Sequence, residues 1–467
     1  MAEKSPRKRY TTPSSPESRS PIHTIQVGSA KDHKQPEFLN GRHKNAFGGT
    51  FGAVALIVVL PLTVLWANDL VVRVYPNFLS NCDIRALLQR AYNRFNPWAL
   101  VLVCGWILFH FAFYRLVPVG KWAIGRRPEA DRSGEVIAYR CNGFHSFVFC
   151  GTLVLGAFFY RNYHFSWFMS NWSSIVTASI LVSFVGSVLL YLKALRAPVQ
   201  QLSDVGFEKT ASHIYKFFMG AELNPRVWDI DLKFVCELRP GLIGWCLFVW
   251  MLMCNHLYTL TAWQGLNLPL VFICATQTIY VVDALWNEAS ILTTFDILHE
   301  GFGFMLVFGN LVWVPCVFTL HAQYVFRRAA ATHWIVLKVA AVLFGVGFWI
   351  CHRSNKEKNR WRTCSQKERD QIDFEHIKTF IPGRDLLADG WWRWARHPNY
   401  LGDILIAISW SMACGTNHLL PHLYLMYLCV LLISRVYRDE EQMSYKYGSA
   451  WLQYCDIVPY RLIKGIW

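Results

Sequence analysis

Long apolar stretches separated by shorter polar segments fill the chain from residue 47 onward. Several of the stretches are shorter than the roughly 20 residues that cross hydrocarbon squarely, so their number is about ten. Their limits are 47–67, 97–118, 144–160, 173–195, 241–262, 266–285, 303–323, 334–351, 401–414 and 419–434. The pattern predicts an all-α, polytopic membrane protein with about ten transmembrane helices.

Basic residues alternate between the connecting segments. Segments 119–143, 196–240, 352–400 and 435–467 are rich in Lys and Arg, whereas 161–172, 263–265 and 415–418 contain Arg161 and no other Lys or Arg. Segment 324–333, with Arg327 and Arg328, is a mild exception. Because cytoplasmic loops carry the excess of Lys and Arg, an even number of spans predicts that both termini are cytosolic or nucleoplasmic.

Residues 1–46 differ from the rest in composition. They contain nine Lys/Arg and four Asp/Glu, and Ser5, Thr12, Ser15 and Ser20 each precede a proline. Low hydrophobicity and net charge predict a disordered tail over 1–46, followed by a membrane domain over 47–467. We expect no cleavable signal peptide, since the tail has no apolar stretch. The tail is either simply solvated or a phosphorylation-controlled segment that binds an acidic partner, chromatin included.

Composition agrees with a lipid environment. Hydrophobic residues make up 54% of the 467 residues and charged residues only 16%, against about 25% in soluble domains. The net charge of +15 suits nucleic acid, a membrane surface or an anionic cofactor, and the loop alternation accounts for much of it. The 14 cysteines form no CxxC pair, so we expect free thiols and no metal site or disulfide framework.

Two polar clusters lie near the end of apolar stretch 266–285. Tyr280, Asp283 and Asn287 follow i, i+3, i+7 spacing and so share one helix face. They mark either a functional site at membrane depth, where Tyr280 donates a proton to a substrate, or a helix end that meets water. Asp296, His299 and Glu300 form the second cluster; a single histidine among carboxylates favours a hydrogen-bonded network over a metal site.

The last third of the chain combines basic and aromatic residues around short apolar stretches. Runs 352–362, 386–403 and 434–461 contain Arg and Lys suited to phosphate and rings suited to stacking. A basic segment beside a membrane is often only a topology signal, which is the alternative interpretation. No strand–GxGxxG–helix unit occurs, so a dinucleotide would not be held by a Rossmann domain.

These motifs resemble those of a known family. Gly220-Ala-Glu-Leu-Asn-Pro-Arg226, Cys236-Glu-Leu-Arg-Pro-Gly241, the blocks 283–288, 294–304 and 386–403, and the closing Lys446-Tyr-Gly448 and Val458-Pro-Tyr-Arg461 carry the resemblance. Over residues 50–467 the chain resembles the C14 and C7 sterol reductases, the family that includes the membrane domain of lamin B receptor. The resemblance implies ten membrane helices, a lipid-open cavity for a sterol substrate and an NADPH pocket within about 350–467.

The resemblance also implies residue roles. Lys358 and Arg362 would contact the adenosine phosphates of NADPH. The pocket would be lined by Leu387, Trp392, Asn399, Tyr400, Asp403, Arg435, Tyr447 and Tyr454. Tyr280 and Asp439 match positions near the reacting centre, where Tyr280 would donate a proton to C15, with Asp283 or Asp439 as relay, while C14 receives hydride. The implied locations are the endoplasmic reticulum membrane and the inner nuclear membrane.

The chain departs from the family pattern at Lys216, Ala221, Glu300, Asn310, His352 and Arg393. These departures leave open a second function class, a catalytically impaired protein whose tail anchors lamina or chromatin at the inner nuclear membrane. Arg396-His-Pro-x-Tyr400 also resembles isoprenylcysteine methyltransferases that use S-adenosylmethionine. Those enzymes are much shorter and lack every motif matched before residue 380, so this third alternative is the weakest.

Overall fold

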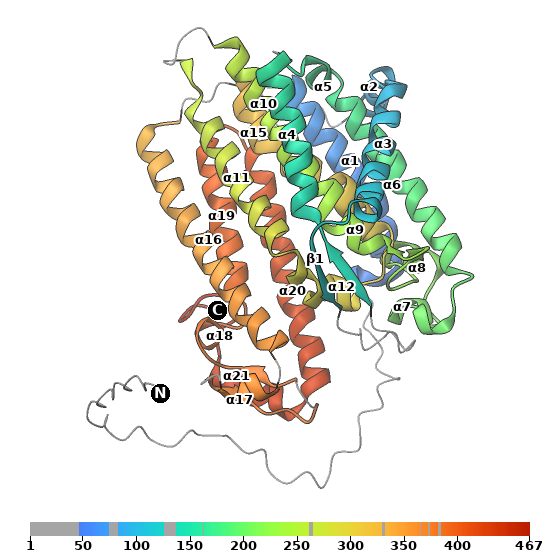
Figure 1. The fold of residues 1–467 in the computed structure, drawn as a ribbon, viewed down its shortest axis with the longest axis vertical. Helices are drawn as coiled ribbons and strands as arrows, with labels where there is room; N and C mark the ends of the chain where they lie inside the picture. The colour runs from blue at the N-terminus through green and yellow to red at the C-terminus, as the bar shows by residue number, and fades with distance from the viewer. Residues whose placement is uncertain are drawn as a thin grey trace, which may run out of the picture.

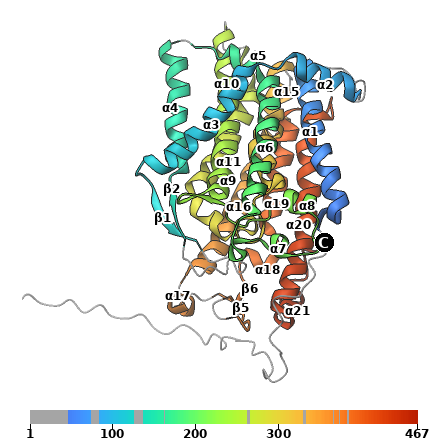
Figure 2. The same ribbon diagram turned by 90° about the vertical axis from the view of Figure 1, so that its right-hand side faces the viewer.

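A computed structural model describes residues 46–73, 83–125, 137–161, 163–260, 265–328, 332–364, 366–371, 374–381 and 384–467. The predicted tail over 1–46 lies outside these ranges except for Ala46. Long helices run roughly side by side along one axis and form a single bundle, with short helices and loops at its two ends (Figures 1 and 2).

Nine helical stretches of the described residues are long and apolar enough to cross a membrane. They are Ala46–Val72, Pro97–Leu116, Gly143–Arg161, Trp172–Ala194, Leu232–Thr259, Leu268–Trp286, Phe304–Arg328, Trp334–Thr363 and Leu420–Tyr447. A further helix, α19 (Pro398–Ala413), has 16 residues and is about 24 Å long, so it falls just short of the hydrocarbon thickness. These helices correspond to the ten predicted stretches, and the predicted class of polytopic α-helical membrane protein is confirmed.

Figure 1 labels the helices in chain order. The long ones are α1 (Gly49–Arg73), α3 (Pro97–Leu116), α4 (Gly143–Arg161), α6 (Trp172–Ala194), α10 (Gly244–Thr259), α11 (Leu268–Trp286), α16 (Trp334–Thr363), α19 and α20 (Leu423–Tyr447). The short ones are α2 (Ile84–Asn93), α5 (Ser166–Ser170), α7 (Asp204–Phe207), α8 (His213–Met219), α9 (Leu232–Leu238), α12 (Phe295–His299), α13 (Phe304–Phe308), α14 (Val314–Val317), α15 (Leu320–Arg328), α17 (Gln366–Gln371), α18 (Trp391–Trp394) and α21 (Ser449–Ile457).

Three antiparallel strand pairs and several single turns complete the described chain. The pairs are β1 (Lys121–Ile124) with β2 (Ala138–Cys141), β3 (Arg226–Val227) with β4 (Ile230–Asp231), and β5 (His376–Ile377) with β6 (Leu386–Leu387). The 3-10 turns are η1 (Ala46–Gly48), η2 (Val199–Gln201), η5 (Glu288–Thr293) and η7 (Leu420–His422), and η3 (Arg239–Ile243) and η6 (Gly309–Trp313) are π-helices.

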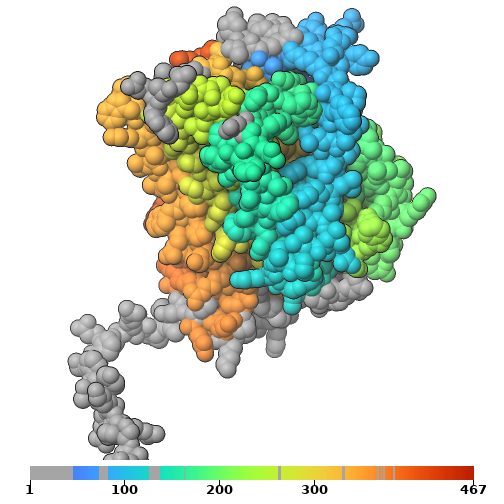
Figure 3. All heavy atoms as spheres, turned by 45° about the horizontal axis from the view of Figure 1, so that its top comes forward, coloured from blue at the N-terminus to red at the C-terminus, as the bar shows by residue number. Residues whose placement is uncertain are grey.

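Two continuous helical stretches form the interior of the bundle. In α9–η3–α10 and in α13 to α15, 67% and 61% of the most apolar window is buried, against 22–39% in the other spans. Both interior stretches contain a π-helix, and the two π-helices face each other: a Cβ on Gly241 would lie 2.2 Å from the Asn310 carbonyl oxygen. Helices α3, α4 and α16 lie on the outside (Figure 3).

Helix limits differ from the predicted stretches at several ends, and the differences at Leu232, Thr363 and Tyr447 are the largest. The interior helix begins at Leu232, so Lys233 and Arg239, predicted in a basic loop, are fully buried. Protein groups, and not water, are the partners of these two charges. The number of apolar residues along the sequence does not reveal such partners. Helix α16 continues to Thr363, past the predicted limit of 351, because Lys, Glu and Arg favour helix once it has started.

The two ends of the bundle differ in what they carry. One end, which we call the basic end, holds β1 and β2, α7, α8, α12, α17, α18 and α21, and both the start of α1 and the C-terminus lie there (Figures 1 and 2). The Arg438 guanidinium lies 4.8 Å from the centre of the Phe47 ring, so α20 contacts η1 just before α1. The far end holds α2 and α5, and Arg90 and Arg94 of α2 pair there with Asp69.

Candidate functional site

A group of cations and rings at the basic end includes the residues that the resemblance assigned to NADPH; we call it the cofactor pocket. The Lys358 amino group lies 3.9 Å from the centre of the Trp392 ring. Arg362, one turn further along α16, donates a hydrogen bond to the Thr293 carbonyl at 2.8 Å. The Asp439 carboxylate on α20 interacts electrostatically with both cations. The structure therefore brings Lys358, Arg362, Trp392 and Asp439 together.

Aromatic residues form the outer part of the cofactor pocket. Trp392 donates from Nε1 to the Ser354 carbonyl at 2.9 Å, and its own carbonyl accepts from the Tyr454 hydroxyl at 3.0 Å. Leu387 packs with Trp392 in a small buried cluster, and Tyr447 lies near Arg362. Burial raises the pKa of the Tyr454 phenol, so this hydroxyl is a donor throughout the neutral range.

The first turn of α19 adds further residues to this group. Asn399 donates to Asn355 at 3.2 Å, and the Tyr400 ring stacks on His397 with 5.0 Å between ring centres. The Tyr400 hydroxyl lies near Arg435 and Asp439. His397 is almost fully buried, and this burial lowers the pKa of its imidazole to about 4, so the ring is neutral at physiological pH.

One turn deeper on α19, Asp403 connects the cofactor pocket to Tyr280. Its carboxylate accepts from the Cys351 thiol at 3.4 Å and lies beside the Tyr280 hydroxyl. Tyr280 packs between two tryptophans, with ring centres 6.0 Å from Trp245 and 5.8 Å from Trp410. Tyr280 is thus held in an aromatic, largely dry part of the bundle, next to an acid.

Close approach of two glycines places α19 against α16. A Cβ on Gly347 would lie 2.8 Å from the Gly402 carbonyl oxygen, and a Cβ on Gly402 would lie 2.6 Å from the Gly347 carbonyl oxygen. Only glycine allows the two backbones to come this near. This crossing sets Cys351 on α16 beside Asp403 on α19.

Asp283 lies one turn beyond Tyr280 on α11 and is half-exposed. Its carboxylate accepts from Asn287 at 2.9 Å and pairs with His352 Nδ1 at 2.8 Å. The predicted face of Tyr280, Asp283 and Asn287 is therefore present at the end of α11. His352, which replaces the usual arginine of the family pattern, makes the contact with Asp283 from α16.

The predicted cluster around α12 is built from ion pairs. Asp296 accepts from Arg435, a residue assigned to the cofactor, and Glu300 accepts from Arg438. Both arginines come from α20. Among the described residues there is no group of three or more His, Cys, Asp or Glu side chains arranged to hold a metal ion.

The remaining departures from the family pattern have identifiable surroundings. Arg393 pairs with Glu375, and both side chains are more than half exposed, so Arg393 does not fill the pocket. Asn310 donates to Glu237 at 2.7 Å, and Lys216 donates to the Gly206 carbonyl at 3.2 Å. Ala221 is a buried residue whose carbonyl accepts from the Ser203 amide at 2.9 Å.

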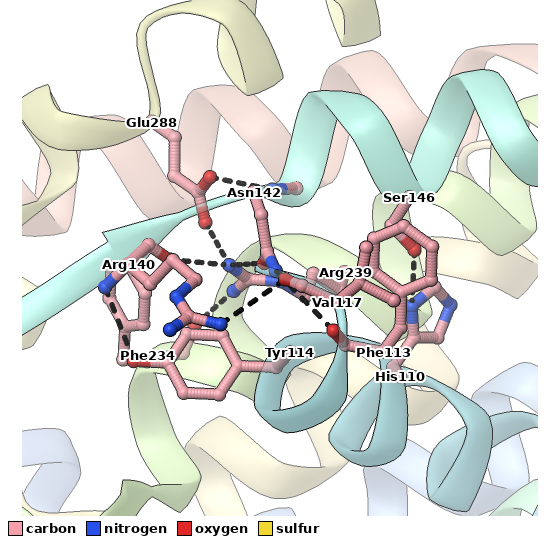
Figure 4. A network of polar contacts seen from close by, with 11 residues as sticks. His110, Phe113, Tyr114, Val117, Arg140, Asn142, Ser146, Phe234, Arg239 and Glu288 are labelled. Atoms are coloured by element: carbon pink, nitrogen blue, oxygen red, sulfur yellow. Dashed lines mark hydrogen bonds and ion pairs between the residues drawn. The ribbon is translucent and has the colours of Figure 1, made fainter. Parts of the chain in front are cut away.

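A buried ion pair that the sequence analysis did not single out joins three segments: η3 of the interior helix, η5 and the start of α4 (Figure 4). Arg239 and Glu288 form the pair at 2.5 Å with both side chains essentially unexposed. Glu288 also accepts from the Gly143 amide at 2.7 Å, and Arg239 donates to Asn142 at 3.1 Å. The sequence signal for this pair was a charged residue next to an apolar stretch. A charged side chain at membrane depth requires a partner.

The cofactor pocket has the polar character that a phosphorylated ligand needs. Within the described part of the chain, no carboxylate forms an ion pair with Lys358 or Arg362. His397 Nε2 and the amide oxygens of Asn359 and Asn399 are buried without a hydrogen-bond partner there. Cations without a direct ion pair and unused polar atoms are suited to the phosphates and polar edges of a dinucleotide, so these residues fit NADPH.

Comparison with known proteins gives a consistent result. The model of the ergosterol biosynthesis ERG4/ERG24 family matches residues 42–467. The chain is 36% identical over 433 residues to "Delta(14)-sterol reductase LBR" of Gallus gallus, covering 92% of this chain and 66% of that protein. It is 39% identical over 421 residues to "Delta(14)-sterol reductase TM7SF2" of Mus musculus, covering 90% and 97%. A "Delta(14)-sterol reductase" of Ascobolus immersus is 34% identical over 443 residues, covering 90% and 98%.

Proposed function

The chain belongs to the ERG4/ERG24 family of sterol reductases, and from this premise we propose that it reduces the C14=C15 double bond of sterol intermediates with NADPH as hydride donor. The similar proteins of Gallus gallus, Mus musculus and Ascobolus immersus are all named delta(14)-sterol reductases. The observation that supports the proposal most directly is the convergence of the assigned residues in one pocket, with Lys358 and Arg362 free of ion pairs among the described residues.

Each part of the pocket has a distinct task in this proposal. Lys358 and Arg362 would hold the phosphates, and Trp392, Tyr400 and Tyr454 supply rings and hydroxyls along the cofactor. NADPH supplies the hydride when it is bound, and the protein contributes orientation and electrostatics. Helix α19 connects the two sites, because Tyr400 faces the pocket while Asp403, one turn deeper, lies beside Tyr280.

Tyr280 is the proposed proton donor. An isolated alkene accepts hydride poorly, so a proton must reach C15 before or together with hydride arrival at C14. The Tyr280 hydroxyl is positioned by Trp245 and Trp410, and Asp403 is the carboxylate beside it. Asp283 lies one turn away, is paired with His352 and is half-exposed. It is the proposed relay through which a proton returns to Tyr280.

Cofactor titration tests the pocket. Purified protein in detergent should bind NADPH saturably, and Lys358→Ala and Arg362→Ala should each weaken binding at least 10-fold, because each removes a cation from the phosphate site. Lys338→Ala is the matched control, since Lys338 also lies over a tryptophan, Trp334, on the same helix but at its other end. Absence of NADPH binding by the wild type would contradict the proposal, and S-adenosylmethionine binding would support the methyltransferase alternative.

Complementation tests the reaction. In cells that lack C14 sterol reductase, the wild type should remove accumulated 14,15-unsaturated sterols, and Tyr280→Phe should not, although it is expressed and binds NADPH. Sterol profiling measures both results. Failure of a well-expressed wild type would favour the non-enzymatic anchoring function.

A second proposal concerns the tail and its location. We propose that residues 1–46, with their excess of Lys and Arg, bind lamin, chromatin or DNA, and that the protein resides in the endoplasmic reticulum and inner nuclear membranes. Pulldown of lamin or nucleosomes by residues 1–46 should weaken when Ser5, Ser15 and Ser20 are replaced by Asp. A tail that captures neither partner would contradict this proposal.

A further inference from the structure

A short segment between η5 and α13, residues 293–300, contacts two arginines of the cofactor pocket. Arg362 of α16 donates to the Thr293 carbonyl at 2.8 Å. Arg435 of α20 pairs with the Asp296 carboxylate. The segment, which follows α11 and precedes the interior helices α13 to α15, therefore contacts the cofactor pocket directly.

The same segment is fixed from its other side by a buried lysine. The Lys233 amino group is fully buried and donates to three backbone carbonyls, those of Asp296, Ile297 and Glu300, at 3.1, 2.8 and 2.9 Å. These carbonyls lie at the C-terminal end of α12, where such groups lack partners within the helix. A buried ammonium group is costly unless its donors are used, so this geometry fixes α12 firmly.

Glycine contacts hold the end of the segment rigidly. A Cβ on Gly301 would lie 2.0 Å from the Gly220 carbonyl oxygen, and a Cβ on Gly303 would lie 2.2 Å from the Gly220 amide nitrogen. The Phe302 amide also donates to the Glu222 carbonyl at 3.0 Å. The segment is thus anchored in the N-terminal half of the bundle, independently of the helices α16 and α20 that it contacts.

We propose that residues 293–300 are a positioning element that sets the orientation of Arg362 and Arg435 toward the bound dinucleotide, with Asp296 as its principal side chain. This inference rests on the proposed cofactor site. Arginine side chains have several rotatable bonds, and a fixed partner on one side of each guanidinium reduces the freedom that binding must otherwise remove. Asp296 would act through Arg435 and is a positioning residue without contact to the reacting atoms.

The sign of the Asp296 effect distinguishes positioning from simple electrostatics. Removing a carboxylate beside a site for a polyanion should strengthen binding if only charge mattered. Loss of a fixed partner should instead weaken binding, because Arg435 is no longer held in its orientation. The two explanations therefore predict opposite changes for Asp296→Asn.

The chain offers a matched control four residues away. Glu300 lies in the same segment and also pairs with an arginine of α20, but Arg438 lies over the rings of Phe47 and Phe295 and is not among the residues assigned to the cofactor. Purified wild type, Asp296→Asn and Glu300→Gln would be titrated with NADPH, and the steady-state constants for NADPH and sterol measured. Thermal unfolding would establish that each variant is folded.

We expect Asp296→Asn to raise the dissociation constant and the KM for NADPH about 10-fold, on the scale of one lost charge-assisted hydrogen bond, while kcat and the sterol KM change less than about 3-fold. Glu300→Gln should change NADPH affinity less than about 3-fold. Unchanged or stronger binding by Asp296→Asn would overturn the inference, as would equal weakening by both variants. If Asp296→Asn does not fold, Asp296→Glu is used, and the inference then requires weakening of about 3-fold. A wild type that binds no NADPH contradicts the proposed function itself.

Discussion

At the residue scale, buried charges determine how the interior of this membrane protein is built. Arg239 and Glu288 are buried, and each uses the other together with Asn142 and the Gly143 amide (Figure 4). A paired charge in such surroundings adds little net stability over an apolar pair, but a single charge left behind is very costly. The pair therefore specifies how η3, η5 and the start of α4 meet.

This asymmetry gives a stability prediction. Glu288→Gln removes the negative partner and should lower the free energy of unfolding by about 3–5 kcal/mol, whereas the double change Arg239→Met with Glu288→Leu should restore a substantial part of it. Thermal unfolding in detergent measures both. A double variant no more stable than Glu288→Gln would contradict the explanation.

His397 gives a pH prediction. Burial lowers the pKa of His397 to about 4 in the folded protein, whereas in the unfolded chain it is about 6.5. The unfolded chain therefore takes up the proton first, so the contribution to stability is complete above pH 6.5 and is lost as the pH falls toward 4, by about 3 kcal/mol in total. The charged groups around the ring, Asp439, Lys358, Glu440 and Arg396, act in opposite directions and modify the size of the effect.

The measurement compares how steeply the unfolding temperature falls with pH in two proteins. Unfolding temperatures between pH 7 and pH 4.5 should fall more steeply for the wild type than for His397→Asn, which has no group that titrates in this range. The carboxylates contribute equally to both proteins, so their effect cancels in the difference. Parallel curves would show that His397 is not the group responsible.

At the element scale, the crossing of α16 and α19 joins the pocket to Tyr280, and it depends on Gly347. We predict that Gly347→Ala destabilises the protein by about 1–3 kcal/mol and weakens NADPH binding, because its Cβ would meet α19 backbone at 2.8 Å and no rotamer change relieves that contact. Gly345→Ala is the control on the same helix: nothing lies within 4 Å of its Cβ, so it should be neutral or slightly stabilising. Unfolding temperature and NADPH titration separate the two, and equal behaviour would refute the role of the crossing.

The elements also show what the sequence can predict. Apolar stretches predicted each long helix because lipid and core both select for apolar residues. They did not predict that the interior helix starts at Leu232 or that α16 reaches Thr363, because charged residues there are satisfied by partners distant in sequence or by the helix itself. Lys233 is the clearest case: its three carbonyl partners lie more than 60 residues away.

At the scale of the whole molecule, some residues of the candidate site could be suggested from the sequence, and others stand out only through their contacts in the fold. The motif resemblance suggested the candidate cofactor residues between α16 and α21, and these residues lie close together at the basic end. The sequence assigned the segment 293–300 only a hydrogen-bonded network and did not single out the Arg239–Glu288 pair, because the importance of both lies in contacts with distant segments. A pattern within one stretch indicates which residues are unusual, and only the fold shows what they touch.

Orientation in the membrane is the last prediction, and the proposed function depends on it. NADPH is a cytosolic cofactor in this proposal, so the basic end, with the pocket and both described chain ends, must face the cytosol or nucleoplasm, as the Lys and Arg distribution predicts.

Exposed Lys209, after α7 at the basic end, and exposed His164, before α5 at the far end, allow a direct test. In cells with only the plasma membrane permeabilised, an impermeant maleimide should label Lys209→Cys and should label His164→Cys only after full solubilisation. The thirteen cysteines in the described part of the chain are buried or half-buried, and Cys82 lies outside the described residues. Cys82→Ser is therefore the background for both cysteine variants, and this background alone is the blank. The reverse labelling would place the pocket on the lumenal side, where cytosolic NADPH cannot reach it, and would contradict both the orientation and the proposed reductase.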